Sequence, residues 1–541
     1  MTDCRTDLRP SRAARRGLVL VLVLVVVAIL ALVSLAFAEL MRTERAAAQV
    51  AAERVQARLL AESGIAFTRQ LLARGPQWQD DLGGIHENAA QFRGVLVLDP
   101  TGPAGPGRFT VVSPGVEAGE YAGLRFGLED ESTRLNLNAL LLLEQTVPGA
   151  GRELLLGLPG MTVDIADAIL DWMDLDDEPR EFGAELDYYA VQVPPYAPKN
   201  GPLETVEELL LVRGVTPWLL FGGDANRNFL LDPGEPIVEP MATASGSLAS
   251  MDRGWSAYLT LFSKERNRQA DGSPRIDVNQ QDLETLYLEV EEILGPQAAA
   301  FIIAYRQNRP YSGAEAGWTI GEGESPAEGS VRAFLSPLVE SEETPSAELV
   351  IDFSGRARTR IDTVLDLVGA RTRVNVEGQQ EPVVVDSPFI EDTALMPAYL
   401  PAMMDALTAV AEPVIPGRIN INQAPRVILE GIPGMRIDLV DAIIANRVQD
   451  PVQDTVGRDH ETWILSEGLV SLEEMKALIP FVTVRGDVYR GQFVGFFDEG
   501  GPIARIEVVI DATESYPRVV FWREISHLGP GYPPDFLGVE W

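Results

Sequence analysis

The residues of this chain best suited to chemistry form an acidic loop from 224 to 235. Oxygen donors stand at its first, third, fifth, ninth and twelfth positions, with a backbone carbonyl at the seventh. Ca²⁺ takes about six to eight hard oxygen ligands, and this spacing is that of an EF-hand loop. We therefore predict a calcium site with these ligands: Asp224, Asn226, Asn228, Leu230 (carbonyl), Asp232 and Glu235.

One residue departs from the EF-hand pattern. Phe229 occupies the sixth position, where glycine usually makes the sharp turn. A bulky residue at positive φ costs free energy, so we expect weak binding, with a Kd of roughly 10⁻⁴ to 10⁻³ M. The alternative interpretation is an acidic turn, rich in Asn and Pro, that holds no ion.

A second acidic stretch lies upstream, with carboxylates at Asp174, Asp176, Glu185 and Asp187. Around one loop they would supply the same hard donors, although a solvated acidic loop is an equal alternative.

The sequence contains no motif that indicates catalytic chemistry. The three histidines are far apart, and no His-x-x-x-His or Gly-x-Ser-x-Gly motif occurs. We predict no catalytic residues and no enzyme activity.

The cysteine count and the net charge exclude further classes of site and of ligand. The single cysteine, Cys4, lies in the basic N-terminal stretch, so the rest of the chain can form neither disulfides nor thiolate metal sites. The formal net charge is −36, which repels phosphate backbones and attracts divalent cations.

An apolar segment near the start of the chain is expected to anchor the structural elements that position these sites. Leu18 to Phe37 contains Ser34 as its only polar residue, and Arg15 and Arg16 stand just before it. About 20 apolar residues suffice to cross the ~30 Å hydrocarbon core, because every backbone amide bonds within its own helix. The arginines place the N-terminus in the cytoplasm and the remainder of the chain on the other side.

Three interpretations of this segment compete. A cleaved signal could end at Ala36-Phe37-Ala38, but its core normally has ~7–15 residues. A plain anchor leaves the small residue Gly17 unexplained. The third is a basic leader, residues 1–17, cut after Gly17 by a prepilin peptidase so that Leu18 becomes the N-terminus.

Helical sequence continues from Glu39 to Leu72, because this stretch is rich in Ala and free of Pro. Gly75-Pro76 ends it, giving a rod of ~55 residues and roughly 80 Å. Leu60, Phe67 and Leu71 repeat at helical spacing, so we predict that this stripe binds a partner.

Beyond the long helix, the sequence on both sides of the middle region predicts β-strands. Short apolar runs at 95–98, 109–112 and 124–128 precede the middle of the chain, and a three-strand meander spans 487–525. Neither end has enough strands alone, so we expect them to pair into one sheet on the long helix, with the middle as an insertion.

The insertion contains a repeat. The pattern Arg, apolar, Asn or Asp, apolar, Asn starts at 134, 275 and 418, with a degenerate copy at 373. Each full copy leads to an Ala-rich helix, at 165–173, 298–306 and 439–447. Two copies carry a Pro-Gly turn, at 158–161 and 432–435, that looks like a helix-hairpin-helix turn. Such units often bind DNA, but their acidic flanks here oppose phosphate contact, so we expect no nucleic acid.

Leader, glycine cleavage point, apolar half-helix and amphipathic half-helix together resemble the type IV pilin and pseudopilin families. Leu22, the fifth mature residue, replaces the Glu usual there, which is a feature of the K-type minor pseudopilins of type II secretion. Six sequence blocks follow that family's order: Leu135 to Asn138, Leu158-Pro159-Gly160, Asp171 to Asp176, Gly183 to Tyr189, Pro195 to Leu203 and Glu207 to Gly214.

The resemblance implies a minor pseudopilin at the tip of a short periplasmic filament that drives export of folded proteins, with calcium in its helical domain. It implies a single-pass inner-membrane protein whose C-terminal head lies in the periplasm. Its partners would be other minor pseudopilins, prepilin peptidase and the secreted substrate. The alternatives are a membrane-anchored DNA-binding or DNA-uptake protein and a generic anchored scaffold that keeps its leader.

The predicted fold class is α+β: a long transmembrane and amphipathic helix, a pilin-like antiparallel sheet from both chain ends, and a large, mainly α insertion with helix-hairpin-helix-like repeats. The expected parts are the leader (1–17), the helix (18–75), the first strands (76–133), a helical domain with the calcium loops (134–240), an extra repeat with flexible linkers (241–400), a helix-hairpin-helix unit (401–485) and the last strands (486–541).

Overall fold

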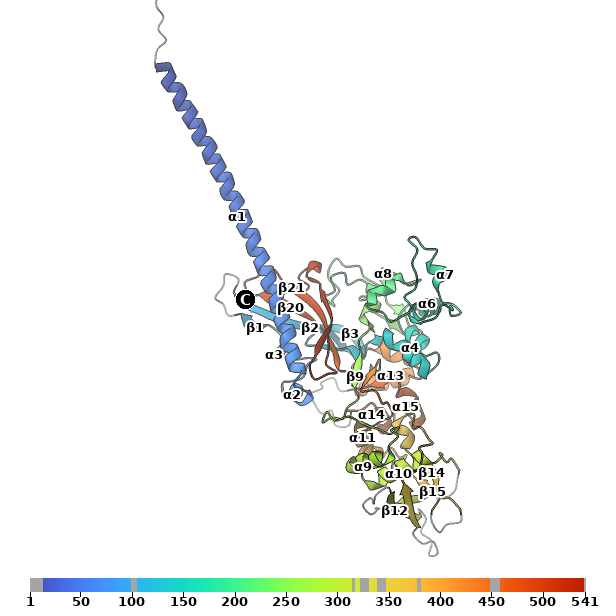
Figure 1. Cartoon of the computed structure of the whole chain (residues 1–541). Helices are drawn as coiled ribbons and strands as arrows, with labels where there is room; N and C mark the ends of the chain where they lie inside the picture. The colour runs from blue at the N-terminus through green and yellow to red at the C-terminus, as the bar shows by residue number, and fades with distance from the viewer. Residues whose placement is uncertain are drawn as a thin grey trace, which may run out of the picture.

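One long helix dominates the computed structural model, which describes residues 13–98, 105–313, 317–321, 330–337, 347–376, 381–447 and 458–539. Helix α1 spans Ala13–Leu72, 60 residues, and its first half stands free of the head (Figure 1). Among the described residues it is the one helix long and apolar enough to cross a membrane. By length and composition this helix suggests a single-pass membrane anchor. The greater part of the predicted leader, residues 1–12, lies outside the described residues.

Helix α1 ends as predicted. Gly75 takes a positive φ of 86°, and Pro76 begins the short helix α2 (Pro76–Asp81). Glycine adopts this left-handed conformation without steric cost, and proline suits the first turn of the new helix.

The two chain ends form one antiparallel sheet of seven strands, as predicted. Its main order is β1-β2-β20-β21-β22, with β3 on β2 and β4 on β20. Three C-terminal strands thus complete a sheet begun before the insertion. Its strands are β1 (Val95–Leu98), β2 (Gly107–Glu117), β3 (Glu120–Phe126), β4 (Glu129–Asp130), β20 (Val488–Phe497), β21 (Ala504–Asp511) and β22 (Arg518–Glu524).

The second half of α1 packs on this sheet, and this corrects the predicted partner stripe. Leu60 is buried against Phe497 and Ala504 of the strands, and Leu71 is buried in a second apolar cluster on the sheet, against which Phe67 packs. A Cβ on Gly64 would lie 2.8 Å from the ring of Phe109, so glycine lets helix and sheet approach closely. The predicted apolar periodicity is correct, but these side chains face the chain's own sheet and not a partner.

A partly buried histidine beside Tyr489 of the sheet makes the head sensitive to acid. The Nδ1 of His86 lies 3.1 Å from the Leu128 carbonyl. Burial, with a smaller contribution from Arg125, lowers the pKa of His86 to about 4. Because the unfolded state binds the proton more readily, stability is complete above about pH 6.5 and is lost as the pH falls towards 4.

We expect His86→Gln to remove this pH dependence. Between pH 8 and pH 5 the wild-type chain should lose about 2 kcal/mol of unfolding free energy that the variant does not lose. Urea titrations of the detergent-solubilised chain at the two pH values measure the difference. Identical losses in both proteins would show that the histidine is not held neutral.

The insertion, residues 131–486, is built from three copies of one unit. In each copy the predicted Arg-to-Asn pattern forms a short strand that pairs in parallel with a strand returning at the end of the copy. The pairs are β5 (Leu135–Asn136) with β8 (Leu259–Thr260), β10 (Ile276–Asp277) with β16 (Leu407–Thr408), and β18 (Ile419–Asn420) with β19 (Val482–Thr483).

Asparagine performs the same task in each copy. The Nδ2 of Asn138 donates to Leu203 O (3.0 Å), that of Asn279 to Ile361 O (2.8 Å), and that of Asn422 to Arg458 O (3.4 Å). Each bond ties the start of a copy to a distant loop, which accounts for the repeated residue.

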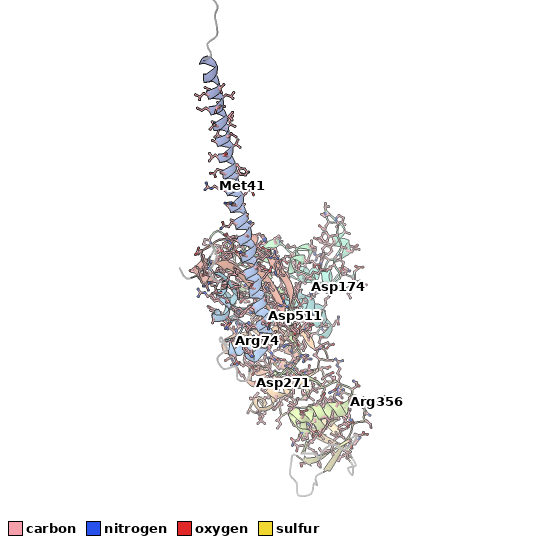
Figure 2. All side chains as sticks on the ribbon, turned by 60° about the vertical axis from the view of Figure 1, so that its left-hand side comes forward. Met41, Arg74, Asp174, Asp271, Arg356 and Asp511 are labelled. Carbon is pink, nitrogen blue, oxygen red and sulfur yellow. The ribbon has the colours of Figure 1, made fainter. Side chains whose placement is uncertain are left out.

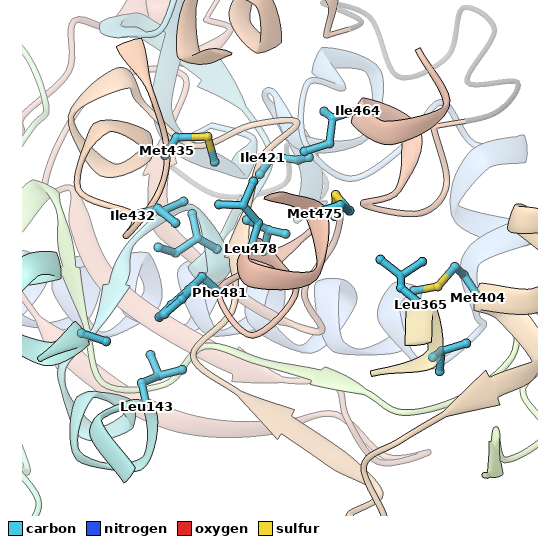
Figure 3. Close-up of a cluster of buried hydrophobic side chains, with 14 of the residues drawn as sticks. Leu143, Leu365, Met404, Ile421, Ile432, Met435, Ile464, Met475, Leu478 and Phe481 are labelled. Carbon is cyan, nitrogen blue, oxygen red and sulfur yellow. The ribbon is translucent and has the colours of Figure 1, made fainter. Parts of the chain in front are cut away.

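Helices fill the three copies. They include α4 (Leu137–Thr146), α5 (Ala150–Leu156), α6 (Val163–Met173), α7 (Leu186–Tyr189), α8 (Pro217–Phe221), α9 (Leu283–Leu294), α10 (Pro296–Gln307), α11 (Met396–Ala406), α12 (Arg426–Glu430), α13 (Ile437–Asn446), α14 (Trp463–Ser466) and α15 (Leu472–Leu478). One apolar core runs through all three copies, and Figure 3 shows Leu143, Leu365 and Phe481 within it.

The two Pro-Gly turns join α5 to α6 and α12 to α13, and their glycines take positive φ (Gly160 67°, Gly434 81°). The Gly160 amide donates to Ala242 O at 3.0 Å, so this amide is already satisfied within the chain. The copies pack against each other where Gly157 meets Gly431, because a Cβ on Gly157 would lie 2.4 Å from the Gly431 Cα.

The insertion holds more sheet than predicted. The middle copy carries five strands in the order β13-β12-β11-β15-β14, where the sequence predicted linkers. The degenerate pattern at 373 falls in an antiparallel edge strand of this sheet and starts no fourth copy. The strands are β11 (Trp318–Ile320), β12 (Ser330–Pro337), β13 (Ala347–Asp352), β14 (Arg371–Val374) and β15 (Val383–Asp386). Parts of the predicted linkers, 314–316, 322–329, 338–346 and 377–380, lie outside the described residues.

Candidate functional site

The predicted calcium loop wraps on itself in the structure. Both Asp224 carboxylate oxygens accept backbone amides, from Asn228 at 3.1 Å and Phe229 at 2.9 Å. Glu235 closes the loop, because its Oε1 accepts the amide of Ala225 at 2.9 Å and its Oε2 accepts that of Asp232 at 2.9 Å. First and last acidic positions therefore face the same interior, as the EF-hand spacing predicts.

Phe229 adopts the strained conformation expected at the sixth position, with φ of 69°. Its ring is held by the guanidinium of Arg253, which lies 4.6 Å from the ring centre and 4.6 Å from that of Tyr121. This stacking offsets part of the backbone strain, because cation-aromatic contacts stabilise by about 0.5–2 kcal/mol.

The loop is also bound to the sheet. Arg505, fully buried on β21, donates to Asn226 O at 3.1 Å and to Arg227 O at 2.8 Å. Within the described residues, no side-chain oxygen of the loop is buried without a hydrogen-bond partner. The loop is therefore satisfied as it stands, and an ion would have to replace existing bonds.

A second acidic group differs in this respect. One oxygen each of Asp171, at the end of α6, Asp174 just after it, and Glu185 before α7 lie within 4.8 Å of one another. Asp171 and Glu185 are 0% and 4% exposed. The end of α6 and the following loop thus bring together three carboxylates that have little exposure to solvent. Asp174 lies on the outer part of the head (Figure 2).

Three oxygens of this group lack a hydrogen-bond partner among the described residues. Both oxygens of Glu185 and the Oδ1 of Asp174 are buried without a hydrogen bond. Arg180 donates to Asp171 Oδ1 at 2.7 Å and to Asp174 as well, but one guanidinium faces three carboxylates. Burial, then repulsion from Asp171 and Asp174, raises the pKa of Glu185 to about 7. A divalent cation would supply the missing charge, so these residues fit Ca²⁺.

A glycine makes room for the group. A Cβ on Gly183 would lie 1.7 Å from Asp171 Oδ2, so any side chain there would displace this carboxylate. Because Gly183 has no side chain, the backbone can approach the acidic group closely.

The region around this group carries the family signal. Residues 133–220 match the family model for the type II secretion system (T2SS), protein K. This part of the chain is similar to protein K of type II secretion. The resemblance predicted from the sequence blocks is confirmed for it.

A solved structure covers more of the chain at lower similarity. This is the crystal structure of the GspK-GspI-GspJ complex from the enterotoxigenic Escherichia coli Type 2 Secretion System, with 10% identity, covering 90% of this chain and 98% of that chain, at a TM-score of 0.31. No curated protein matches this sequence.

The region that matches protein K holds, in this acidic group, two of the four ligands predicted from the acidic stretch. Asp174 and Glu185 belong to the group. Asp176 turns to the Glu178 amide at 2.9 Å, and Asp187 is exposed on α7, so both lie outside it. Asp171 was missed as a member of the group; it lies in the last turn of α6, three residues before Asp174, which follows the helix.

Proposed function

We propose that this protein is a K-type minor pseudopilin that caps the tip of a periplasmic pseudopilus and so serves the export of folded proteins. The observation that supports this most is a region similar to protein K, inserted into a sheet that packs on one long helix with an apolar first half. The protein would act mechanically, as a subunit, and not as an enzyme.

The shape supports a terminal position. Helix α1 leaves the head on one side, and the insertion extends on the other (Figure 1). Subunits that join by parallel helices would lie on the helix side. A bulky insertion beyond the sheet would obstruct the addition of a further subunit there, which is what a cap requires.

The proposal includes an inner-membrane anchor, a periplasmic head and one cut by prepilin peptidase. Gly17 and Leu18 are the residues of that cut. Mass spectrometry of the membrane-extracted chain should find Leu18 at the N-terminus, and Gly17→Val should leave the leader attached and abolish export in cells that depend on this chain. Leu22→Val is the control and should behave as wild type. An intact leader on a functional wild-type chain would contradict the proposal.

We also propose that calcium binds the group of Asp171, Asp174 and Glu185. Ca²⁺ at about 100 times its Kd should raise the unfolding free energy by about 2.7 kcal/mol. Glu185→Gln should abolish most of this gain, whereas Asp187→Asn, an exposed neighbour outside the group, should keep it. Thermal unfolding in EGTA and in millimolar Ca²⁺ measures both. Equal gains in the two variants would remove this group from the proposal.

The loop from Asp224 to Glu235 is the second calcium site of the proposal. Because its oxygens already have partners, we expect weaker binding than at the first group. Asp224→Ala should reduce the calcium-dependent rise in unfolding temperature by less than Glu185→Gln does, in the same assay. An unchanged rise in Asp224→Ala would exclude this loop.

A further inference from the structure

Arginines gather at one cavity of this acidic chain. The cavity has a volume of about 70 Å³ and lies between the first copy of the insertion and strands β20, β21 and β22. Among the described residues, more arginines than carboxylates line it, whereas the whole chain has 44 basic and 80 acidic residues. This reversal of charge favours an anionic ligand. The arginines are Arg134, Arg227, Arg253, Arg490 and Arg523, and the carboxylates are Glu207, Asp224 and Glu507.

The carboxylates do not use all of these donors. Glu507 accepts from Arg490 at 2.7 Å, and Asp224 accepts two backbone amides of its own loop. In the part of the chain that the structure describes, Arg253 makes no ion pair, and its Nη1 is buried without a hydrogen-bond partner. The Nε of Arg134 is likewise buried and unpartnered, on a side chain that is 3% exposed. A buried charged donor without an acceptor costs free energy, and the oxygens of an anion would satisfy both residues.

Aromatic rings hold four of the guanidinium groups in place. A guanidinium that lies over a ring keeps the N–H groups at its edge free for a carboxylate. These donors are therefore positioned before a ligand arrives, which reduces the entropy lost on binding. The Cζ of Arg227 lies 4.8 Å from the ring centre of Phe221, that of Arg253 4.6 Å from that of Phe229, and those of Arg490 and Arg523 5.8 and 4.9 Å from that of Phe521.

Glu207 shows which chemical group these arginines accept. It accepts from Arg227 at 3.4 Å and from Arg523 at 2.5 Å, and all three side chains are 27–30% exposed, so they form the mouth of the cavity. Glu207 belongs to the short helix η2 (Val206–Leu211), and Arg523 belongs to β22. A carboxylate from another molecule would meet the same donors, with Glu207 as its competitor.

The walls indicate what the carboxylate is attached to. Four phenylalanines line the cavity, and each of them is partly exposed. Ligand sites commonly combine apolar walls with a few polar groups that fix the orientation of the ligand. A water molecule needs only ~10–15 Å³ of such space, so a group of several atoms fits. The four residues are Phe221, Phe229, Phe262 and Phe521.

We propose that this cavity binds the carboxylate of an apolar organic acid, either a small aromatic acid or the C-terminal residue of a polypeptide. The carboxylate takes the free donors of Arg253 and Arg134, and the apolar group lies among the phenylalanines. Arg227 and Phe229 belong to the loop of residues 224–235, so a bound acid also fixes that loop against the sheet. This site does not depend on the proposed function.

Titration calorimetry of the detergent-solubilised full chain tests the site, with N-acetylphenylalanine as the probe. The chain should bind this acid and should not bind N-acetylphenylalanine amide, which has nearly the same shape and no charge. Arg253→Gln should raise the Kd about tenfold or more, because a hydrogen bond to a charged group is lost. Arg518→Gln, exposed on the same strand as Arg523 and outside the cavity, should bind as the wild type does.

Glu207→Gln separates a change of charge from a damaged fold. Removal of the competing carboxylate should lower the Kd about threefold, whereas a damaged fold would raise it. Failure to bind the acid, equal binding of acid and amide, or tighter binding of inorganic phosphate than of the acid would overturn the proposal. An unchanged Kd in both Arg253→Gln and Glu207→Gln would overturn it as well.

A tripeptide identifies the source of the carboxylate. Acetyl-Ala-Ala-Phe carries the same terminal residue on a longer chain. A Kd equal to that of N-acetylphenylalanine would support the site and assign it to a polypeptide C-terminus. A Kd about tenfold higher would support the site and assign it to a small acid, because the additional residues then meet the walls.

Discussion

Replacing Arg490 with Met should unfold the joint between the sheet and the insertion. Arg490, on β20, donates to Glu131 at the start of the insertion and, at 2.7 Å, to Glu507 on β21. All three side chains are buried or nearly so. Burial opposes the ionised form of Glu507, yet Arg490 and Arg523 hold its pKa below the ordinary value.

Removing one partner of a buried ion pair costs about 3–5 kcal/mol, because the remaining charge stays buried and unpaired. We therefore expect Arg490→Met to lower the unfolding free energy by about that amount in urea titrations of the full chain. Arg518→Ala is the control. It breaks the exposed pair with Glu514 and should cost less than about 0.5 kcal/mol.

A double variant separates lost charge from lost packing. Arg490→Met combined with Glu131→Gln removes the unpaired carboxylate that lies deepest, with 0% exposure. It should therefore recover part of the stability that Arg490→Met loses. A double variant less stable than the single one would show that packing of the arginine stem, and not charge, holds the joint.

Gly495→Val should detach α1 from the sheet. A Cβ at this position of β20 would lie 2.0 Å from Ala57 O and 2.6 Å from Ala61 N, both backbone atoms of the helix. Backbone cannot turn aside as a side chain can, so the helix must lift from the strand. Overpacking of this kind costs about 1–3 kcal/mol or more, and we expect about 3 kcal/mol here.

Hydrogen exchange reports the detachment directly. Amides of residues 57–72 should lose protection in Gly495→Val, while those of the insertion keep theirs. Gly491→Ala on the same strand is the control. Its new Cβ would meet only side-chain atoms of Leu128 and Val111, at 3.0 and 3.1 Å, and these can yield. Equal loss of protection in both variants would contradict this account of the joint.

The rod and the sheet could be predicted because each depends on local periodicity. The apolar run, the Pro-free helix and the alternating strands at both ends lie within a few residues of their predicted bounds. The three-copy insertion could also be predicted, since its Asn residues make equivalent bonds in each copy.

Burial could not be predicted in the same way. Leu60 and Val55 lie on opposite faces of α1 and have similar side chains, so sequence alone does not say which face meets the sheet. The sheet of the middle copy was missed because its strands are short and stand among residues rich in Gly, Glu, Ser and Pro. Asp171 was missed because a buried carboxylate at a helix end resembles a solvated one in sequence.

The insertion departs from the sheet and returns to it at adjoining points. Asp130 pairs with Tyr489 across β4 and β20, and its Oδ2 accepts the Gly486 amide at 2.7 Å. The start and the end of the insertion are therefore in direct contact at the sheet, whatever the number of residues between them. Whole repeats could be added or removed there with the long helix and its sheet unaltered, so the size of the insertion can differ between related chains while the base that carries it stays the same.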